Sequence, residues 1–273
     1  MDRLFVAHKP SGIGSNLFLS KLKRKYGEKK AGFTGTLDPF AKGVLIVGMG
    51  SYTKLFRFLN KTPKTYKATL WLGAKSDSLD TEMIENVEFL DEFETLHVED
   101  AVLSLKGELE YEPPIFSAKR IDGKRAYDLA RAGKKVVLNK INSTIYDIKL
   151  LNYSHPFVSF EATVSEGTYI RSLGLLIANK LGVKYGSLSY LERLNEGQFV
   201  YEYEKALDIK KVLNIPKNEY LGKKDNLLYG RVLALSDLKI QKDGTYWLEG
   251  DGFIAVVTVE DKKVKYELGK IKC

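Results

Sequence analysis

A two-residue alternation is the pattern that most constrains the fold of this chain. From Thr65 to Leu72 the apolar positions Tyr66, Ala68, Leu70 and Leu72 recur at every second residue. Successive side chains of a strand point to opposite faces, so this pattern predicts a strand with one buried face. The chain must therefore form a sheet, and other elements must cover that face.

Helix and strand patterns follow one another irregularly up to residue 203. Phe18, Leu22 and Tyr26 recur every four residues, which predicts a helix over 16–26 with Ser15 as its N-cap and Gly27 ending it. Further strands are expected at 43–47, 145–153 and 156–164, and further helices at 52–59, 95–105, 126–132 and 172–181. No βαβ unit repeats, so we predict an α+β fold with a mixed, mainly antiparallel sheet flanked by helices.

The pattern changes after Tyr203. Residues 210–225 are polar and typical of a linker, and short strand candidates follow at 227–235, 245–248, 253–259 and 264–268. This pattern predicts a small β-rich second domain. We place the domains at 1–215 and 216–273.

Composition excludes several classes of protein. No run of about 18 apolar residues is present, and the N-terminus has no apolar segment typical of a signal peptide. The single cysteine is Cys273, which fits a reducing cytoplasm. His8, His97 and His155 are the only histidines and lack the spacing of metal ligands, so no metal site is expected.

Charge is distributed unevenly along the chain. Residues 1–60 hold 11 basic and 3 acidic residues, a balance of 11 − 3 = +8. Residues 77–110 hold 1 basic and 12 acidic residues, a balance of 1 − 12 = −11. A basic region beside an acidic one favours binding of a polyanion on one side of the molecule, as in nucleic-acid-binding proteins.

One carboxylate stands out among the residues that could carry chemistry. Asp38 lies in the glycine-rich segment Ala31–Pro39, immediately before a proline. Aspartates in such turns commonly hydrogen-bond to nearby backbone amides, so the segment by itself fits an ordinary turn as well as a catalytic loop.

Five segments in order carry a resemblance to a known family. They are Lys9–Gly12, Ala31–Pro39, Lys64–Lys67, Gly167–Arg171 and Tyr190–Leu194. Together, over roughly the first 200 residues, the chain resembles the bacterial TruB family, the tRNA pseudouridine-55 synthases. The β-rich tail is similar to the small PUA-like RNA-binding domain of that family.

The resemblance implies an isomerase that converts one uridine in the T loop of tRNA to pseudouridine, without a cofactor. It implies that Asp38 acts at the ribose, as a nucleophile or by stabilising a glycal-type intermediate. Arg171 matches the arginine that pairs with this aspartate, and a nearby cation favours the charged carboxylate. Tyr66 matches the tyrosine that lies against the target base and is the candidate general base.

Other positions match substrate contacts of the family. Tyr169 and Leu191 correspond to residues that line the uridine pocket, where an extruded base is held by stacking and apolar contact. Lys9 and Pro10 correspond to the motif behind the catalytic loop. Phe33 replaces a common histidine that wedges into the T loop, and it keeps the aromatic face without the ring-nitrogen hydrogen bonds.

The basic turn at 119–125 falls where the family carries an insertion that closes on the T arm. We therefore expect phosphate contacts from Lys119 and Lys124, with Arg120 and Arg125 beside them. Expected partners are the T-stem loop of tRNA, with no membrane and no obligate protein partner, so we expect a monomer. Two alternatives stay open: a non-catalytic tRNA-binding or tRNA-folding protein, and a pseudouridine synthase for another RNA.

Overall fold

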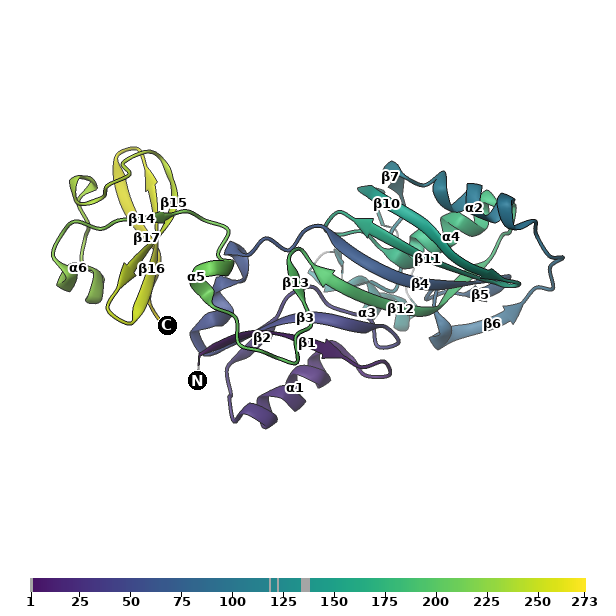
Figure 1. Ribbon diagram of the computed structural model, residues 1–273. Coiled ribbons are helices and arrows are strands. Elements are labelled where there is room, and N and C mark those ends of the chain that lie inside the picture. The colour runs from purple at the N-terminus through teal and green to yellow at the C-terminus, as the bar shows by residue number, and fades with distance from the viewer. Residues whose placement is uncertain (1, 118, 122, 134–137) are drawn as a thin grey trace.

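The computed structural model describes residues 2–117, 119–121, 123–133 and 138–273, and Figure 1 shows its arrangement. A long sheet forms the larger unit, and a small β-rich unit lies at one end of it. No helix in this part of the chain is long and apolar enough to cross a membrane.

The large sheet is mixed but mainly antiparallel. Across the sheet its strands are β1 (Arg3–Lys9), β3 (Lys42–Met49), β12 (Gly186–Glu196), β4 (Lys64–Leu72), β11 (Phe157–Val164), β10 (Ile141–Ser154) and β7 (Gly107–Tyr111). The pair β12–β3 is parallel, and the other pairs along this path are antiparallel. Strand β2 (Ala31–Phe33) pairs with β3, and β13 (Phe199–Val200) pairs with β12. This arrangement confirms the predicted α+β class.

Strand β4 shows the alternation expected from its sequence. Tyr66, Ala68, Leu70 and Leu72 are all buried in the main hydrophobic core. The opposite face carries hydroxyl pairs across the strands, for example between Thr65 and a threonine of β11 at 3.0 Å. One face of the sheet is therefore apolar and the other partly polar, as a half-covered antiparallel sheet requires.

Three helices cover the apolar face. They are α1 (Ser15–Tyr26), α2 (Thr95–Leu103) and α4 (Ile170–Lys180), and residues from each belong to the main core. Short elements complete the unit, namely η1 (Gly50–Phe58), β5 (Ala74–Ser76), η2 (Thr81–Met83), β6 (Ile84–Val87), β8 (Arg120–Ile121), β9 (Lys124–Arg125), α3 (Ala126–Arg131) and α5 (Ile209–Val212). The segment expected as a helix over 52–59 is the 3₁₀ helix η1.

Ser15 is not an N-cap, contrary to the expectation from sequence. It occupies the first position of α1, and Gly14 is the N-cap. Its hydroxyl instead donates to the carbonyl of Leu37 at 2.8 Å and accepts from the Leu37 amide at 3.0 Å. A buried tertiary partner thus takes the hydroxyl that a cap would use. Gly27 does end the helix, in the left-handed conformation.

The C-terminal unit is a four-stranded sheet with a short helix. Its strands are β14 (Lys217–Asn218), β15 (Gly244–Gly250), β16 (Phe253–Glu260) and β17 (Lys263–Lys272), with α6 (Lys224–Leu228) and η3 (Leu235–Asp237) beside them. The predicted strand at 227–235 is wrong, because its start lies in α6 and the left-handed Gly230 follows that helix. The polar stretch 210–225 is also more ordered than a linker, since it contains β14.

The two units share a hydrophobic cluster. Leu4, Val6 and Ile46 of the large sheet lie in one cluster with Trp247 and Ile254 of the small sheet. The same cluster includes Leu55 of η1, and η1 contacts β17, so the small unit packs against η1 on the side of the large sheet opposite to α1, α2 and α4. The exact boundary between residues 215 and 216 stays a prediction.

Candidate active site

The segment that carries Asp38 is a loop between β2 and β3, held from behind by buried polar groups. The ammonium of Lys9 donates to the carbonyls of Ile13 at 2.7 Å and Pro39 at 3.3 Å. Ser15 holds the adjacent Leu37 through the two hydrogen bonds described above. The loop is thus fixed on both sides of Asp38.

Lys9 supports the loop and lines neither of the cavities described below. Its side chain is fully buried, and this burial lowers its pKa to about 8, although the carboxylate of Asp38 opposes the shift. This position agrees with the motif behind the catalytic loop to which Lys9 and Pro10 correspond, and the expected substrate contact of Lys9 stays a prediction.

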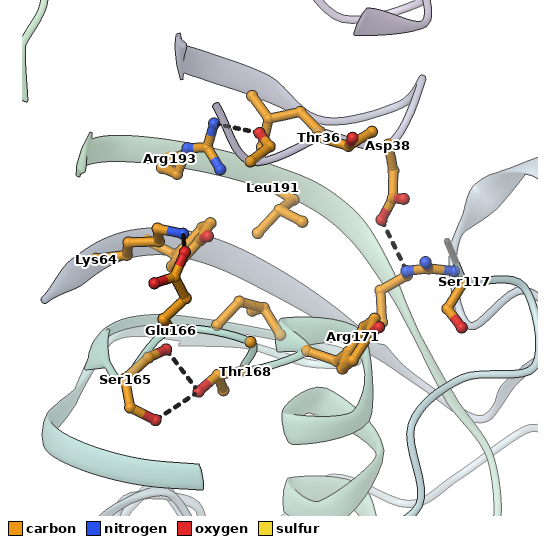
Figure 2. A pocket seen from close by; sticks show the side chains of 16 residues that line it. Thr36, Asp38, Lys64, Ser117, Ser165, Glu166, Thr168, Arg171, Leu191 and Arg193 are labelled. Carbon is orange, nitrogen blue, oxygen red and sulfur yellow. Dashed lines mark hydrogen bonds and ion pairs between the residues drawn. The ribbon is translucent and has the colours of Figure 1, made fainter. Parts of the chain in front are cut away.

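Arg171 lies directly against the carboxylate of Asp38. Its Nε is 2.9 Å from Oδ2 of Asp38, and its side chain is only 5% exposed. The ion pair that the resemblance implies is present, and Figure 2 shows it at one side of the cavity. Arg171 comes from the first turn of α4, immediately after the Gly167–Tyr169 turn.

The remaining nitrogens of Arg171 are also occupied. Nη1 donates to the carbonyl of Ser78 at 2.6 Å, and Nη2 donates to the carbonyl of Phe116 at 2.8 Å. Asp80 provides a second carboxylate, 3.6 Å from Nη1. The planar guanidinium is therefore fixed in orientation, and it presents one edge to Asp38.

Effects of opposite sign act on the pKa of the Asp38 carboxyl group. Burial in the pocket raises its pKa, the Arg171 cation lowers it, and the nearby Asp80 carboxylate raises it. The net direction is upward. Arg171 therefore serves mainly to limit the cost of keeping an ionised carboxylate in a poorly hydrated place.

Tyr66 lies on β4 beside Leu191 and Arg193 of β12. It pairs across the strands with Arg193, and the neighbouring Ala68 pairs with Leu191. Burial raises the pKa of the Tyr66 phenol, while the guanidinium of Arg193 acts to lower it. The phenol therefore stays protonated near neutral pH. This protonation state fits a role of Tyr66 as an aromatic surface that stacks on the uracil better than a role as an unassisted proton acceptor.

A cavity of about 310 Å³ lies in front of these groups. Its walls include Asp38, Tyr66, Tyr169, Arg171 and Leu191, the five residues that the sequence assigned to catalysis and the uridine pocket. Figure 2 shows Leu191 between the Asp38–Arg171 pair on one side and Lys64 and Glu166 on the other. Aromatic and apolar side chains beside the Asp38–Arg171 ion pair fit a planar, uncharged ring joined to a sugar.

Phe33 does not line this cavity. It lines a second cavity of about 520 Å³, which shares Asp38 and Arg171 with the first and is also bordered by Asp80. Phe33 is thus placed beside the catalytic loop, in a different cavity from Tyr66. Its wedge role stays a prediction.

The basic turn lies outside both cavities as far as its side chains are described. Lys119 donates from Nζ to the carbonyl of Asn139 at 3.5 Å. The side chains of Arg120, Lys124 and Arg125 lie outside the described residues, so their expected phosphate contacts stay predictions.

Sequence reasoning missed the part of the acidic segment that belongs to the site. Asp80 follows Leu79, whose φ of +58° is uncommon for a leucine, and this turn directs the carbonyl of Ser78 and the carboxylate of Asp80 to Arg171. The only sequence signal was a Ser- and Asp-rich turn after a strand. Residues 77–110 as a whole had no assigned function.

Comparison with known proteins shows the family to which this fold and this site belong. The class that the fold and pocket define is the pseudouridine synthases. Residues 23–170 match the TruB family pseudouridylate synthase (N terminal domain), which is more than half of the chain. The chain belongs to this family, and it is therefore an isomerase.

Individual relatives cover the full length. The chain is 71% identical over 273 residues to the tRNA pseudouridine synthase B of Sulfurimonas denitrificans, covering 100% of both. It is 53% identical over 271 residues to the protein of that name from Sulfurovum sp., covering 99% of this chain and 98% of the relative.

A solved structure shares the fold of both units. A chain in the crystal structure of a Cbf5-Nop10-Gar1 complex matches with a TM-score of 0.66 and 19% identity, covering 99% of this chain and 84% of that one. The likeness at this identity concerns the fold alone. It includes the small β-rich unit, so the predicted two-part architecture is confirmed.

Proposed function

We propose that the protein converts the uridine at position 55 in the T loop of tRNA to pseudouridine, with Asp38 acting at the ribose. The observation that carries the proposal is the Asp38–Arg171 pair, with 2.9 Å between Oδ2 and Nε, at the wall of a cavity lined by Tyr66, Tyr169 and Leu191. The names of the full-length relatives, tRNA pseudouridine synthase B, support tRNA as the substrate.

The chemistry needs no atom beyond those of the substrate and a proton relay. The bond between ribose C1′ and uracil N1 breaks, a bond between C1′ and C5 forms, C5 loses a proton and N1 gains one. An ionised Asp38 can add to C1′ or stabilise a glycal-type intermediate, and both routes require the carboxylate form. Tyr66 and Leu191 hold the detached uracil while it turns.

Charge supports the binding of a polyanion in a defined orientation. The basic residues within 1–60 surround the catalytic loop in sequence, whereas two acidic residues of 77–110, Glu99 and Asp100, lie on the exposed side of helix α2. The proposal includes three sets of RNA contacts. They are phosphate contacts from Lys119 and Lys124, a wedge formed by Phe33, and contacts from residues 216–273. The proposal also includes action in the cytoplasm, as a monomer and without an obligate protein partner. The mass of the protein in solution would test the monomeric state.

Tritium release tests the reaction directly. Unmodified tRNA with tritium at uridine C5 should release tritium with the protein, and Asp38→Asn should abolish release while keeping tRNA binding. A tRNA with cytidine in place of the T-loop uridine should release none from that loop. Release unchanged by Asp38→Asn would remove the assignment of Asp38.

The same assay separates the two alternatives. A non-catalytic tRNA-binding or tRNA-folding protein would bind tRNA without release, and a synthase for another RNA would release tritium only from that RNA. The joint presence of Asp38, Arg171 and Tyr66 around one cavity favours the enzyme, because a binding protein needs no carboxylate held by a buried arginine there.

A further inference from the structure

A group of buried charges lies beneath the catalytic loop, and the proposed chemistry does not use it. Arg193 is 2% exposed, Glu196 is fully buried, and Lys64 is 6% exposed. Nη2 of Arg193 is 2.7 Å from Oε1 of Glu196, and Nζ of Lys64 is 3.9 Å from Oε2. Thr34, the first residue of the loop after β2, donates its hydroxyl to the same Oε2 at 2.9 Å.

Arg193 connects this group to the backbone on both sides of the loop. Its Nη2 donates to the carbonyl of Gly35 at 2.8 Å, and its Nε donates to the carbonyl of Val44 in β3 at 2.8 Å. Figure 2 shows the first of these bonds reaching from β12 to the loop. The two ends of the segment that carries Asp38 are therefore fixed to one guanidinium.

The loop lies directly on this group. Gly35 has φ of +51°, and a Cβ there would be 3.0 Å from Nη1 of Arg193 and 3.3 Å from Oε2 of Glu196. A side chain at position 35 would thus meet the ion pair as well as an unfavourable backbone conformation. The loop backbone at Gly35 therefore packs closely against the Arg193–Glu196 pair.

The same guanidinium lies beside Tyr66. Arg193 and Tyr66 are register partners on β12 and β4, and both line the uridine pocket. The Arg193 cation opposes the rise in the pKa of Tyr66 that burial causes. One residue therefore contacts both the loop of Asp38 and the aromatic wall opposite.

Stability alone does not explain a buried ion pair at this position. Removing two charges from water costs several kcal/mol per ion, and apolar pairs of similar volume are often as stable or more stable. We infer that the Arg193–Glu196 pair is a positioning device, which holds the loop at Gly35 and the ring of Tyr66 so that Asp38 and the base meet in reactive geometry. This inference rests on the proposed function.

An apolar replacement of the pair separates positioning from folding. The double variant Arg193→Met/Glu196→Leu keeps the volume and removes both charges, so a purely structural pair would be replaced without loss of turnover. We expect the folded double variant to bind tRNA within about threefold of the parent affinity. Its single-turnover rate should fall on the order of 100-fold, the effect of a small misplacement of reacting groups. The control is Lys149→Met/Glu161→Leu, the same change in charge at a more exposed pair on β10 and β11 that lines neither cavity.

Arg193→Lys tests the same point if the double variant fails to fold. It keeps a cation for Glu196 but cannot donate to Gly35 and Val44 together, so the rate should still fall about tenfold or more at unchanged affinity. The double variant should also shift any alkaline limb that Tyr66 contributes to higher pH. A folded variant with the parent rate would overturn the inference. Parent protein without tritium release would instead refute the proposed function.

Discussion

Asp38 and Arg171 meet at 2.9 Å, although one belongs to the loop after β2 and the other to the first turn of α4. The arginine also holds the backbone at Ser78 and Phe116. Three segments distant in sequence from α4 therefore converge on one guanidinium. The carboxylate gains both a counter-ion and a fixed direction, which is what an ionised group in a poorly hydrated pocket needs.

Replacement of Arg171 should slow the chemical step more than it weakens binding. Arg171→Lys keeps the charge but cannot reach Asp38 and both carbonyls at once, so we expect a loss of at least about 100-fold in single-turnover rate. The affinity for tRNA should change little, since the side chain is buried. Equal losses in rate and affinity would contradict a role directed at Asp38.

The rate should depend on pH through Asp38. Because the ionised form is needed and the pKa of Asp38 is raised by burial, activity should fall on acidification at a pH above the ordinary aspartate value of about 3.9. Asp80→Asn removes a nearby negative charge, which lowers the pKa of Asp38 and should move this acid limb to lower pH. Single-turnover rates from about pH 4 to about pH 8 measure it. A limb that stays in place or moves upward would show that Asp38 does not set it.

Phe33 should act through its aromatic face. Phe33→Ala removes the stacking surface, which is worth about 1–3 kcal/mol per base, so turnover should fall roughly 5- to 150-fold. Phe33→His keeps a flat ring and should stay near the parent turnover. Steady-state kinetics with unmodified tRNA compare the three proteins, and full activity of Phe33→Ala would exclude the wedge.

Lys9 should make stability rise with pH in the alkaline range. Its pKa is about 8 in the folded protein against 10.5 as the ordinary value, so between these values the unfolded chain binds more protons. The free energy of unfolding should therefore gain up to about 3 kcal/mol across this window from Lys9. Urea unfolding at several pH values should show this slope in the parent and its loss in Lys9→Met. An unchanged slope in Lys9→Met would assign the effect to other groups.

The contact between the two units should contribute to stability. Ile254 of β16 is fully buried in the cluster shared with Leu4 and Trp247. Ile254→Ala should lower the free energy of unfolding by about 2–5 kcal/mol, and Ile254→Val by about 1 kcal/mol. Denaturant unfolding measures both, and equal stability of the two variants would mean that the cluster adapts to a cavity.

The sequence alone determined the elements whose pattern is periodic. The alternation over β4 and the four-residue spacing in α1 were sufficient, because one buried face imposes each pattern locally. The predicted strand at 227–235 failed because a short apolar run fits a helix turn equally well. The residues around Asp38 were identified through five ordered motifs rather than through any single one.

Only the tertiary structure decided which charges act together. Asp80 and Glu196 carry no sequence pattern that separates them from surface charges, and the Tyr190–Leu194 motif does not show what Arg193 pairs with. In the structure Arg193 and Glu196 form a buried pair and Asp80 faces Arg171. Local periodicity reports which face of an element is buried, whereas the pairing of charges depends on how distant segments are brought together. The catalytic geometry is therefore a property of strand order and loop anchoring, which no short stretch of residues encodes.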